Sequence, residues 1–216
     1  MRNTVEYVLL NSVTPKTITS STDANPIVIT KASHGLATGD LILIYGHTTN
    51  IAANGIRKVT VVSSSTFSLQ DPYTGANIAG SGAGAGGASG FFCTAPKIPL
   101  TSDFRNASLA INSADTATMT LKVAVSNGKN LVDEGNYGDM PNFGATVTDT
   151  NPYTFAAVVN LEDGAQVEGD TGIAFTGTDF FRNFEVNTNL QKWLTVFPTA
   201  WTQGAITVKV ILSDNG

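Results

Sequence analysis

Short runs in which every second residue is hydrophobic constrain the fold of this chain most. Within residues 27–91 these runs alternate with glycine-bearing turns at a spacing of roughly ten residues, which is typical of a small all-β unit. Each such strand has one apolar face, and an isolated two-stranded hairpin cannot bury these faces. At least three strands must therefore close on one another, and a barrel also removes unpaired strand edges.

The expected barrel has a defined apolar face and defined turns. Its buried face should be formed by Ile27, Ile29, Leu41, Leu43, Tyr45, Val59, Val61, Phe67 and Leu69. Glycines at 35, 39, 46 and 55 fall between the runs, where turns often require a positive φ angle. We interpret them as turn residues.

The same region resembles a known module. The motif Ser33-His34-Gly35-Leu36-Ala37-Thr38-Gly39-Asp40 is followed by Asn54-Gly55 and by Ser65-Thr66-Phe67-Ser68-Leu69. This order is similar to a small β-barrel module of tailed-bacteriophage virion proteins, which is itself likened to a catalytic-cysteine half-domain of ubiquitin-activating enzymes. The resemblance implies a structural module of a virus particle.

Residues 91–216 carry longer alternating runs at wider spacing. The expected strands are 108–112, 116–126, 153–160, 172–175, 183–188, 193–197 and 205–212. Met119, Leu121, Val123 and Val125 alternate with more polar neighbours, which predicts one buried and one wetter face. Seven such strands without a helical period predict an all-β, two-sheet sandwich of the jelly-roll type.

A second resemblance covers the end of the chain. It rests on Asn151-Pro152-Tyr153, Leu161-Glu162-Asp163-Gly164, Gly169-Asp170-Thr171-Gly172-Ile173, Glu185-Val186-Asn187-Thr188-Asn189, Lys192-Trp193 and Gly204. This series is similar to β-sandwich domains of phage structural proteins. It implies a place in a virus particle and transfers no catalytic residue to this chain.

These patterns predict three parts. Residues 1–22 should be an N-terminal strand and connection that belong to the sandwich, 23–90 the small barrel ending in a glycine-rich loop, and 91–216 the sandwich. A run such as 80–90 is a flexible linker in isolation, so we expect an exposed connection there. Because a strand at 5–10 precedes the barrel, the barrel should be inserted into the sandwich.

Composition excludes several kinds of partner. The chain has 216 residues, only 13% of them charged, and a net charge of −5, which argues against a nucleic-acid partner. Its apolar runs are too short for a membrane segment or a signal peptide, so we expect neither. A single cysteine, Cys93, cannot form an internal disulfide, and synthesis in a reducing bacterial cytoplasm fits this.

Several motifs could indicate an enzyme, but each has a simpler interpretation. Gly82-x-Gly84-x-x-Gly87 matches a dinucleotide fingerprint, yet no helix is expected after it, so we interpret it as loop. His34 and His47 lie beside glycine turns without an evident nucleophile, and we expect His34 to make a local turn hydrogen bond. Cys93 should be a small buried side chain. We therefore predict no catalytic residue and no cofactor.

Glu162, Asp163, Glu168 and Asp170 form the densest acidic cluster of the sequence. Oxygen ligands along a loop can bind calcium, but the spacing does not match the helix-loop-helix pattern. We interpret the cluster as a solvated loop between two strands and predict no metal site. A glycosidase carboxylate pair could also lie here, because carboxylate separation cannot be obtained from sequence.

Aromatic residues near the C-terminus suit either a core or a contact surface. Phe180, Phe181, Phe184 and Trp201 are the candidates for a subunit interface, and a sugar-stacking platform is the alternative use of such rings. Trp193 alternates with its neighbours as a core residue does. For Trp201, close to Pro198, core and surface both remain open.

Three hypotheses for function follow. The first is a structural virion protein of a tailed bacteriophage, specifically a capsid decoration or cement protein that contacts the major capsid or other virion proteins. The second is a tail or fibre accessory protein that binds host-surface glycans, and the third is a carbohydrate depolymerase, which the missing catalytic constellation weakens. The expected location is the virion, and closed symmetry favours a homo-oligomer, with a trimer as first choice.

Overall fold

The computed structural model describes residues 4–99, 101, 104, 106–113, 115–126, 153–178, 180–188 and 191–214. Regular structure in these ranges consists of β-strands and two short 3-10 helices, so the all-β prediction is confirmed. The chain divides into two compact units: one contains residues up to Thr14 and the described residues from Pro96 onward, and the other contains Pro15–Ala95.

Among the described residues, no helix has the length and apolarity needed to cross a membrane.

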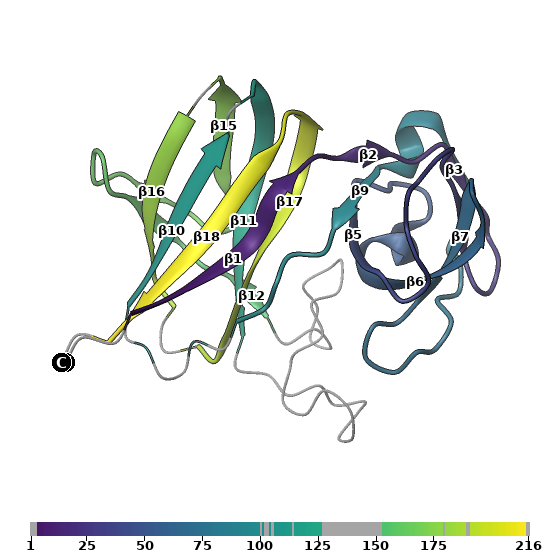
Figure 1. Ribbon diagram of the computed structural model, residues 1–216, viewed down its shortest axis with the longest axis horizontal. Helices are drawn as coiled ribbons and strands as arrows, with labels where there is room; N and C mark the ends of the chain where they lie inside the picture. The colour runs from purple at the N-terminus through teal and green to yellow at the C-terminus, as the bar shows by residue number, and fades with distance from the viewer. Residues whose placement is uncertain are drawn as a thin grey trace. The chain divides into compact units, whose positions relative to one another are not determined.

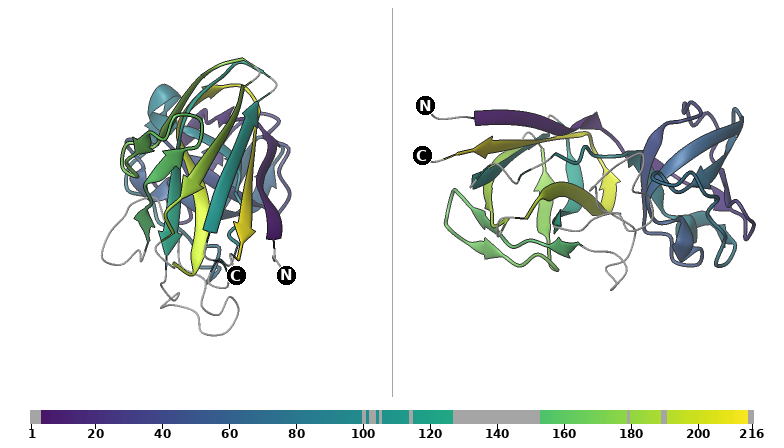
Figure 2. Two further views of the ribbon diagram at one scale, coloured as in Figure 1. Left: turned by 90° about the vertical axis from the view of Figure 1, so that its left-hand side faces the viewer. Right: turned by 90° about the horizontal axis from the view of Figure 1, so that it is seen from below.

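The first unit is a β-sandwich, as predicted, and its larger sheet has six antiparallel strands (Figure 1). Their order is β1 (Thr4–Val13), β18 (Ile206–Ser213), β10 (Asn106–Ser113), β16 (Phe180–Val186), β13 (Val158–Asn160) and β14 (Gln166–Val167). Strands from the two ends of the chain thus lie side by side, which Figure 2 shows from two further directions. Every second residue of β18 is apolar, and these residues, Ile206, Val208, Val210 and Leu212, are fully buried. One face of the strand therefore packs into the core.

The smaller sheet of the sandwich is built around β11 (Ala117–Ser126). Along one edge β11 pairs with β17 (Trp193–Gln203), and along the other with β15 (Ile173–Gly177) and then β12 (Thr154–Phe155). The two sheets meet through apolar side chains: the ring of Phe175 on β15 contacts that of Phe184 on β16, with centroids 6.2 Å apart. The jelly-roll type is a finer assignment and stays a prediction.

A short segment after Pro96 connects the edges of both sheets. The amide of Lys97 donates to the carbonyl of Leu9 on β1 at 3.1 Å. Further along, the amide of Leu194 on β17 donates to the carbonyl of Pro99 at 3.3 Å. Because β1 and β17 each end a sheet, these bonds cover strand edges that would otherwise be open to pairing with another chain.

The second unit is an eight-stranded antiparallel sheet that closes on itself. Its order is β2 (Lys16–Thr17), β9 (Phe91–Thr94), β5 (Leu41–Tyr45), β6 (Gly55–Ser63), β7 (Thr66–Gln70), β4 (Val28–Thr30), β3 (Ser20–Ser21) and β8 (Gly84–Ala85). Segment 16–21 pairs with β9 through β2, at one end of this order, and with β4 and β8 through β3, next to the other end, so one short stretch of chain closes the sheet. The predicted barrel therefore forms.

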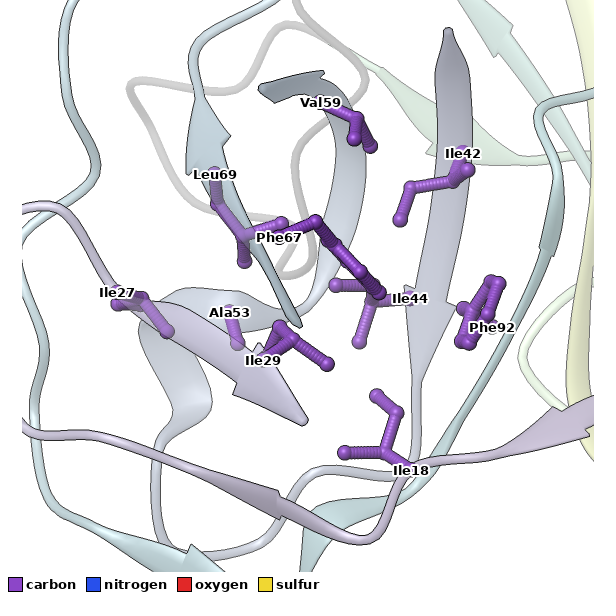
Figure 3. Packing of buried hydrophobic residues seen from close by; sticks show 10 residues of the cluster. All are labelled: Ile18, Ile27, Ile29, Ile42, Ile44, Ala53, Val59, Phe67, Leu69 and Phe92. Carbon is purple, nitrogen blue, oxygen red and sulfur yellow. The ribbon is translucent and has the colours of Figure 1, made fainter. Parts of the chain in front are cut away.

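Figure 3 shows the core of this barrel. Its buried members are Ile18, Ile27, Ile29, Ile42, Ile44, Ala53, Val59, Phe67, Leu69 and Phe92. The prediction for β5 was wrong: Ile42 and Ile44 belong to this core, whereas Leu43 and Tyr45 are buried on the other face and Leu41 is exposed. Every residue of β5 is apolar, so alternation cannot tell one face from the other.

The glycine-rich run is the second correction. It is not a linker, because it contains β8 and the 3-10 helix η2 (Gly86–Ser89), and β8 pairs with β3 of the barrel. The units also have other bounds than predicted. Residues 15–22 and 91–95 belong to the barrel unit rather than to the sandwich, because β2 pairs with β9 and the amide of Ala95 donates to the carbonyl of Leu41.

Candidate functional site

A polar network surrounds the buried side chain of His47 in the barrel, and we call Ser21, His47, Asn50, Asn54 and Ser81 the His47 network. Ser21 and Asn50 are also buried, Asn54 is half-buried and Ser81 is exposed. The imidazole Nε2 lies 2.8 Å from the hydroxyl of Ser21, and the amide of Asn50 donates to Nδ1 at 3.2 Å. The side chain of Asn54 accepts from the His47 amide at 2.9 Å and donates to the His47 carbonyl at 2.8 Å. Ser81 donates to Asn50 Oδ1 through its amide at 3.0 Å.

The contact between Ser21 and His47 has the separation of a nucleophile and its base, but the bond runs in the wrong direction. Nδ1 accepts a backbone N–H, so the proton of the neutral ring is on Nε2 and is donated to Ser21. A general base needs a free lone pair facing the hydroxyl. Asn50 Nδ2 also donates to the Ser21 oxygen at 3.2 Å, and both side chains are buried. This geometry supports a structural role.

His34 makes the local turn hydrogen bond that the sequence predicted. The amide of Leu36 donates to Nδ1 at 3.0 Å, so Nε2 carries the proton and donates to the Ser63 carbonyl at 2.9 Å. Its ring lies edge-on to Phe67, with centroids 5.2 Å apart. The histidine thus fixes the turn after β4 to the end of β6.

Burial shifts the pKa of two further barrel residues, Arg57 and Cys93. Arg57 is buried, and its guanidinium donates to the carbonyls of Ile56, Ala52 and Asn54, while desolvation lowers its pKa to about 10. Cys93 is buried as predicted, and burial raises the pKa of its thiol to about 12. A thiol in this state is a poor nucleophile.

The acidic cluster lies in exposed turns of the sandwich. Asp163 accepts the amide of Ala165 at 2.9 Å, and Glu168 accepts from the side chain of Gln166 at 2.9 Å. Glu162 forms a solvent-exposed ion pair with Arg182 at 3.2 Å. Among the described residues, no group of three or more potential metal ligands gathers. The solvated-turn interpretation agrees with these contacts.

The four interface candidates do not share one environment. Trp201 is only 1% exposed, and its indole N–H donates to the carbonyls of Gln203 and Gly204 at 3.1 and 3.0 Å. Phe184 is also buried, and Phe180 is half-buried and stacks on Phe175. Only Phe181, 58% exposed, presents its ring to solvent. Phe184 and Trp201 are therefore core residues, which corrects their assignment to an interface.

Phe181 lies on the face of the six-stranded sheet that points away from the core, which we call the outer face. Leu161, 53% exposed, follows β13, and its amide donates to the carbonyl of Asn183. Asn183 and Phe181 alternate onto the same face, so Leu161 and Phe181 are diagonal neighbours, which typically lie about 7–8 Å apart. Other residues on this face include Asn112 directly opposite Phe181, Thr207, Val8, Ser108, Ala110, Val159, Glu185, Lys209, Ile211 and, at the edge, Glu6. Three of these residues are charged, and two of them form an ion pair: Nζ of Lys209 lies 2.9 Å from Oε1 of Glu6.

Sequence reasoning missed the polar members of the barrel. The sequence patterns assign no role to Ser21, Asn50 and Arg57, and Asn54 enters only through the Asn54-Gly55 motif. Serine, threonine and asparagine are abundant in this chain, so no local pattern distinguishes those that become buried. The arrangement depends on pairing of β3 with β8, which brings distant segments together.

Comparison with protein-family models, with curated proteins and with solved structures finds no match for this chain.

Proposed function

We propose that this protein is a structural virion component of a tailed bacteriophage, acting as a capsid decoration or cement protein. The outer face of the sandwich is the observation that carries the proposal. It is formed by several strands and exposes Phe181 and Leu161 on a face whose charged residues are Glu185 and the ion pair of Lys209 with Glu6. Aromatic anchors on a face with few charges are typical of protein–protein interfaces.

The chemistry of the barrel supports a structural rather than a catalytic role. The Ser21 hydroxyl accepts hydrogen bonds where a nucleophile would have to donate one, and the Cys93 thiol is buried. The motifs around His34, which resemble those of virion modules, fold into a turn that hydrogen bonds fix. These features add to the low charge content of the chain.

The strand pairing also supports the finer proposal of a jelly-roll-like sandwich. β10 pairs with β18, β11 with β17, and β13 with β16. These pairs are nested, as they would be if one long hairpin were wrapped around the sandwich. Two Greek keys arranged in this way are the basis of jelly rolls.

We expect the protein to act as a homo-oligomer, with a trimer as the first choice, in contact with the major capsid protein or other virion proteins. Repeated sites on a symmetric particle favour closed symmetric assemblies. The outer face supplies the contact in this proposal. Because its charges are few, salt should weaken the contact only slightly.

The test is the copy number of the chain in purified particles, measured by mass spectrometry with isotope-labelled reference peptides. A copy number comparable with that of the major capsid protein supports decoration. A few copies per particle would contradict it and favour a tail or fibre accessory protein that binds host-surface glycans. Phe181→Ser should release the protein from particles in a sedimentation assay, whereas Val62→Ser, an exposed apolar position on the barrel, should not.

A further inference from the structure

The His47 network holds the glycine-rich run against the barrel. β8 pairs with β3, and the Ser81 amide and hydroxyl both bond Asn50 Oδ1, at 3.0 and 3.3 Å. The amide of Gly86 donates to the carbonyl of Thr19 at 3.0 Å. Backbone bonds from the amide of Thr48 to the carbonyl of Ala88 and from the amide of Gly80 to the carbonyl of Ala24 add to these attachments along the run.

The run lies directly on the imidazole of His47. A Cβ atom at Gly84 would be 2.3 Å from Cε1 of His47 and 2.9 Å from Oγ1 of Thr49. Only glycine allows so close an approach. The ring is 2% exposed, so the run must move before water can reach it.

This arrangement suits only the neutral ring. With Nδ1 accepting from Asn50 and Nε2 donating to Ser21, both ring nitrogens are used. A second proton would go on Nδ1 and would direct an N–H group at the N–H group of Asn50. Such a buried donor pair is unfavourable because neither hydrogen finds an acceptor.

No neighbouring charge compensates for protonation. Residues 80–90 contain no ionisable side chain, and none other than His47 occurs in 46–54. After β3 the chain carries Asp23, whose carboxylate accepts the amide of Gly82 at 3.1 Å. On β6 the buried charged group is Arg57, which donates to the carbonyl of Asn54. Burial accordingly lowers the pKa of His47.

We propose that His47 is an acid-sensitive clamp, whose protonation releases residues 80–90 from the barrel while the apolar core stays formed. Residues 80–90 can leave without disrupting the apolar core, because the buried core residues come from other parts of the barrel and none lies in the run. The device can thus expose a polar, glycine-rich segment without unfolding the unit.

The direction of the pH effect on opening follows from how strongly the closed and the open state bind a proton at His47. When the run opens, His47 takes up a proton at its ordinary pKa of about 6.5, whereas the closed state resists it. Opening is therefore favoured as pH falls through that value. Between about pH 7.5 and about pH 5.5 the opening equilibrium should increase about tenfold.

Hydrogen exchange of the full chain, read by mass spectrometry at these two pH values and corrected for intrinsic rates, tests the proposal. We expect protection of peptides within 80–90 to fall about tenfold, while peptides from β5 and β7 keep theirs. His47→Gln retains a donor for Ser21 and does not titrate, so its protection should not depend on pH. His34→Gln changes the other buried histidine and should behave like the natural protein.

Retained pH dependence in His47→Gln, or its loss in His34→Gln, would overturn the proposal. His47→Gln could lack protection of residues 80–90 even near neutral pH. In that case the pH dependence of exchange at the His47 Cε1 hydrogen, measured in the natural protein, gives the titration midpoint of His47 and tests the clamp. A titration midpoint below that of a free histidine supports the clamp. A midpoint at or above it contradicts the clamp.

Discussion

Trp201 and Phe181 belong to the same sandwich, but Trp201 is buried and Phe181 is exposed, so substitution of each tests its assignment at the residue scale. Trp201→Ala should destabilise the sandwich by about 3–5 kcal/mol, because it removes a large core side chain and leaves two carbonyls without their donor. Phe181→Ala should change stability by no more than about 0.5 kcal/mol. Urea unfolding followed by circular dichroism measures both, and similar losses would contradict the assignment.

The four aromatic interface candidates show what sequence can and cannot give at this scale. Their presence near the C-terminus was evident, but core and surface could not be separated, because alternation assigns faces only after the strand register is known. Phe184 is opposite Leu109 in the sheet, which places it on the buried face. The register thus decides the environment of each ring.

Cys93 offers a second prediction at the residue scale. Because burial raises its pKa to about 12, only about one thiol in ten thousand is ionised at about pH 8, against roughly a quarter in an unfolded chain. Labelling with an aromatic disulfide should therefore be about a thousandfold slower in the native protein than in denaturant. The chain has one cysteine, so the signal is unambiguous. Fast native labelling would show that the thiol is accessible.

At the scale of single elements, alternation located most strands but did not show which sheet they join. The expected strand 153–160 is two strands, since the chain leaves β11 after Phe155 and joins β16 at Val158. The expected strand 193–197 continues to Gln203, past Pro198, and the ladder shifts register directly after the Leu121–Pro198 pair and again between Trp201 and Gln203. Proline is tolerated at such irregularities but usually ends a strand.

The glycine-rich run allows an element-scale prediction with a matched control. Gly86 and Gly90 have similar φ angles of 59° and 66°, but a Cβ at Gly90 would lie 2.2 Å from the Tyr45 carbonyl oxygen, whereas Gly86 has open space. Gly86→Ala should cost only the backbone strain, about 1–2 kcal/mol. Gly90→Ala should cost a further 1–3 kcal/mol, roughly, because of the close approach and because its ψ angle of −153° lies outside the left-handed helical region. Thermal unfolding compares them, and equal losses would refute the close approach.

At the scale of the whole molecule, the sequence predicted a barrel inserted into a sandwich. The predicted first and last residues of the barrel were wrong, because they were chosen from local composition. The boundaries at 22/23 and 90/91 followed the polar and glycine-rich stretches. In the structure β2 pairs with β9, so both flanks of the insertion belong to the barrel. Pairing between segments so far apart leaves no local signal. It is also the reason that the glycine-rich run resembled a linker.

Corrected boundaries lead to a prediction about independent folding. Deleting 15–95 should leave a folded sandwich, because the amide of Lys97 bonds to the carbonyl of Leu9 and the cut ends lie only a few residues from that pair. A bridge of about six Gly and Ser residues can span this distance. Both tryptophans, Trp193 and Trp201, lie in the sandwich, so their emission reports on this unit alone.

Deleting only 23–90 is the control, since it keeps Ile18 and Phe92 but removes the barrel core in which both are buried. The exposed apolar side chains and unpaired strand segments should make this variant aggregate. We expect the longer deletion to remain soluble and to unfold cooperatively in urea, with a buried tryptophan spectrum. If the shorter deletion folds and the longer one does not, residues 15–22 and 91–95 stabilise the sandwich, and the unit boundaries at Thr14 and Pro96 are wrong.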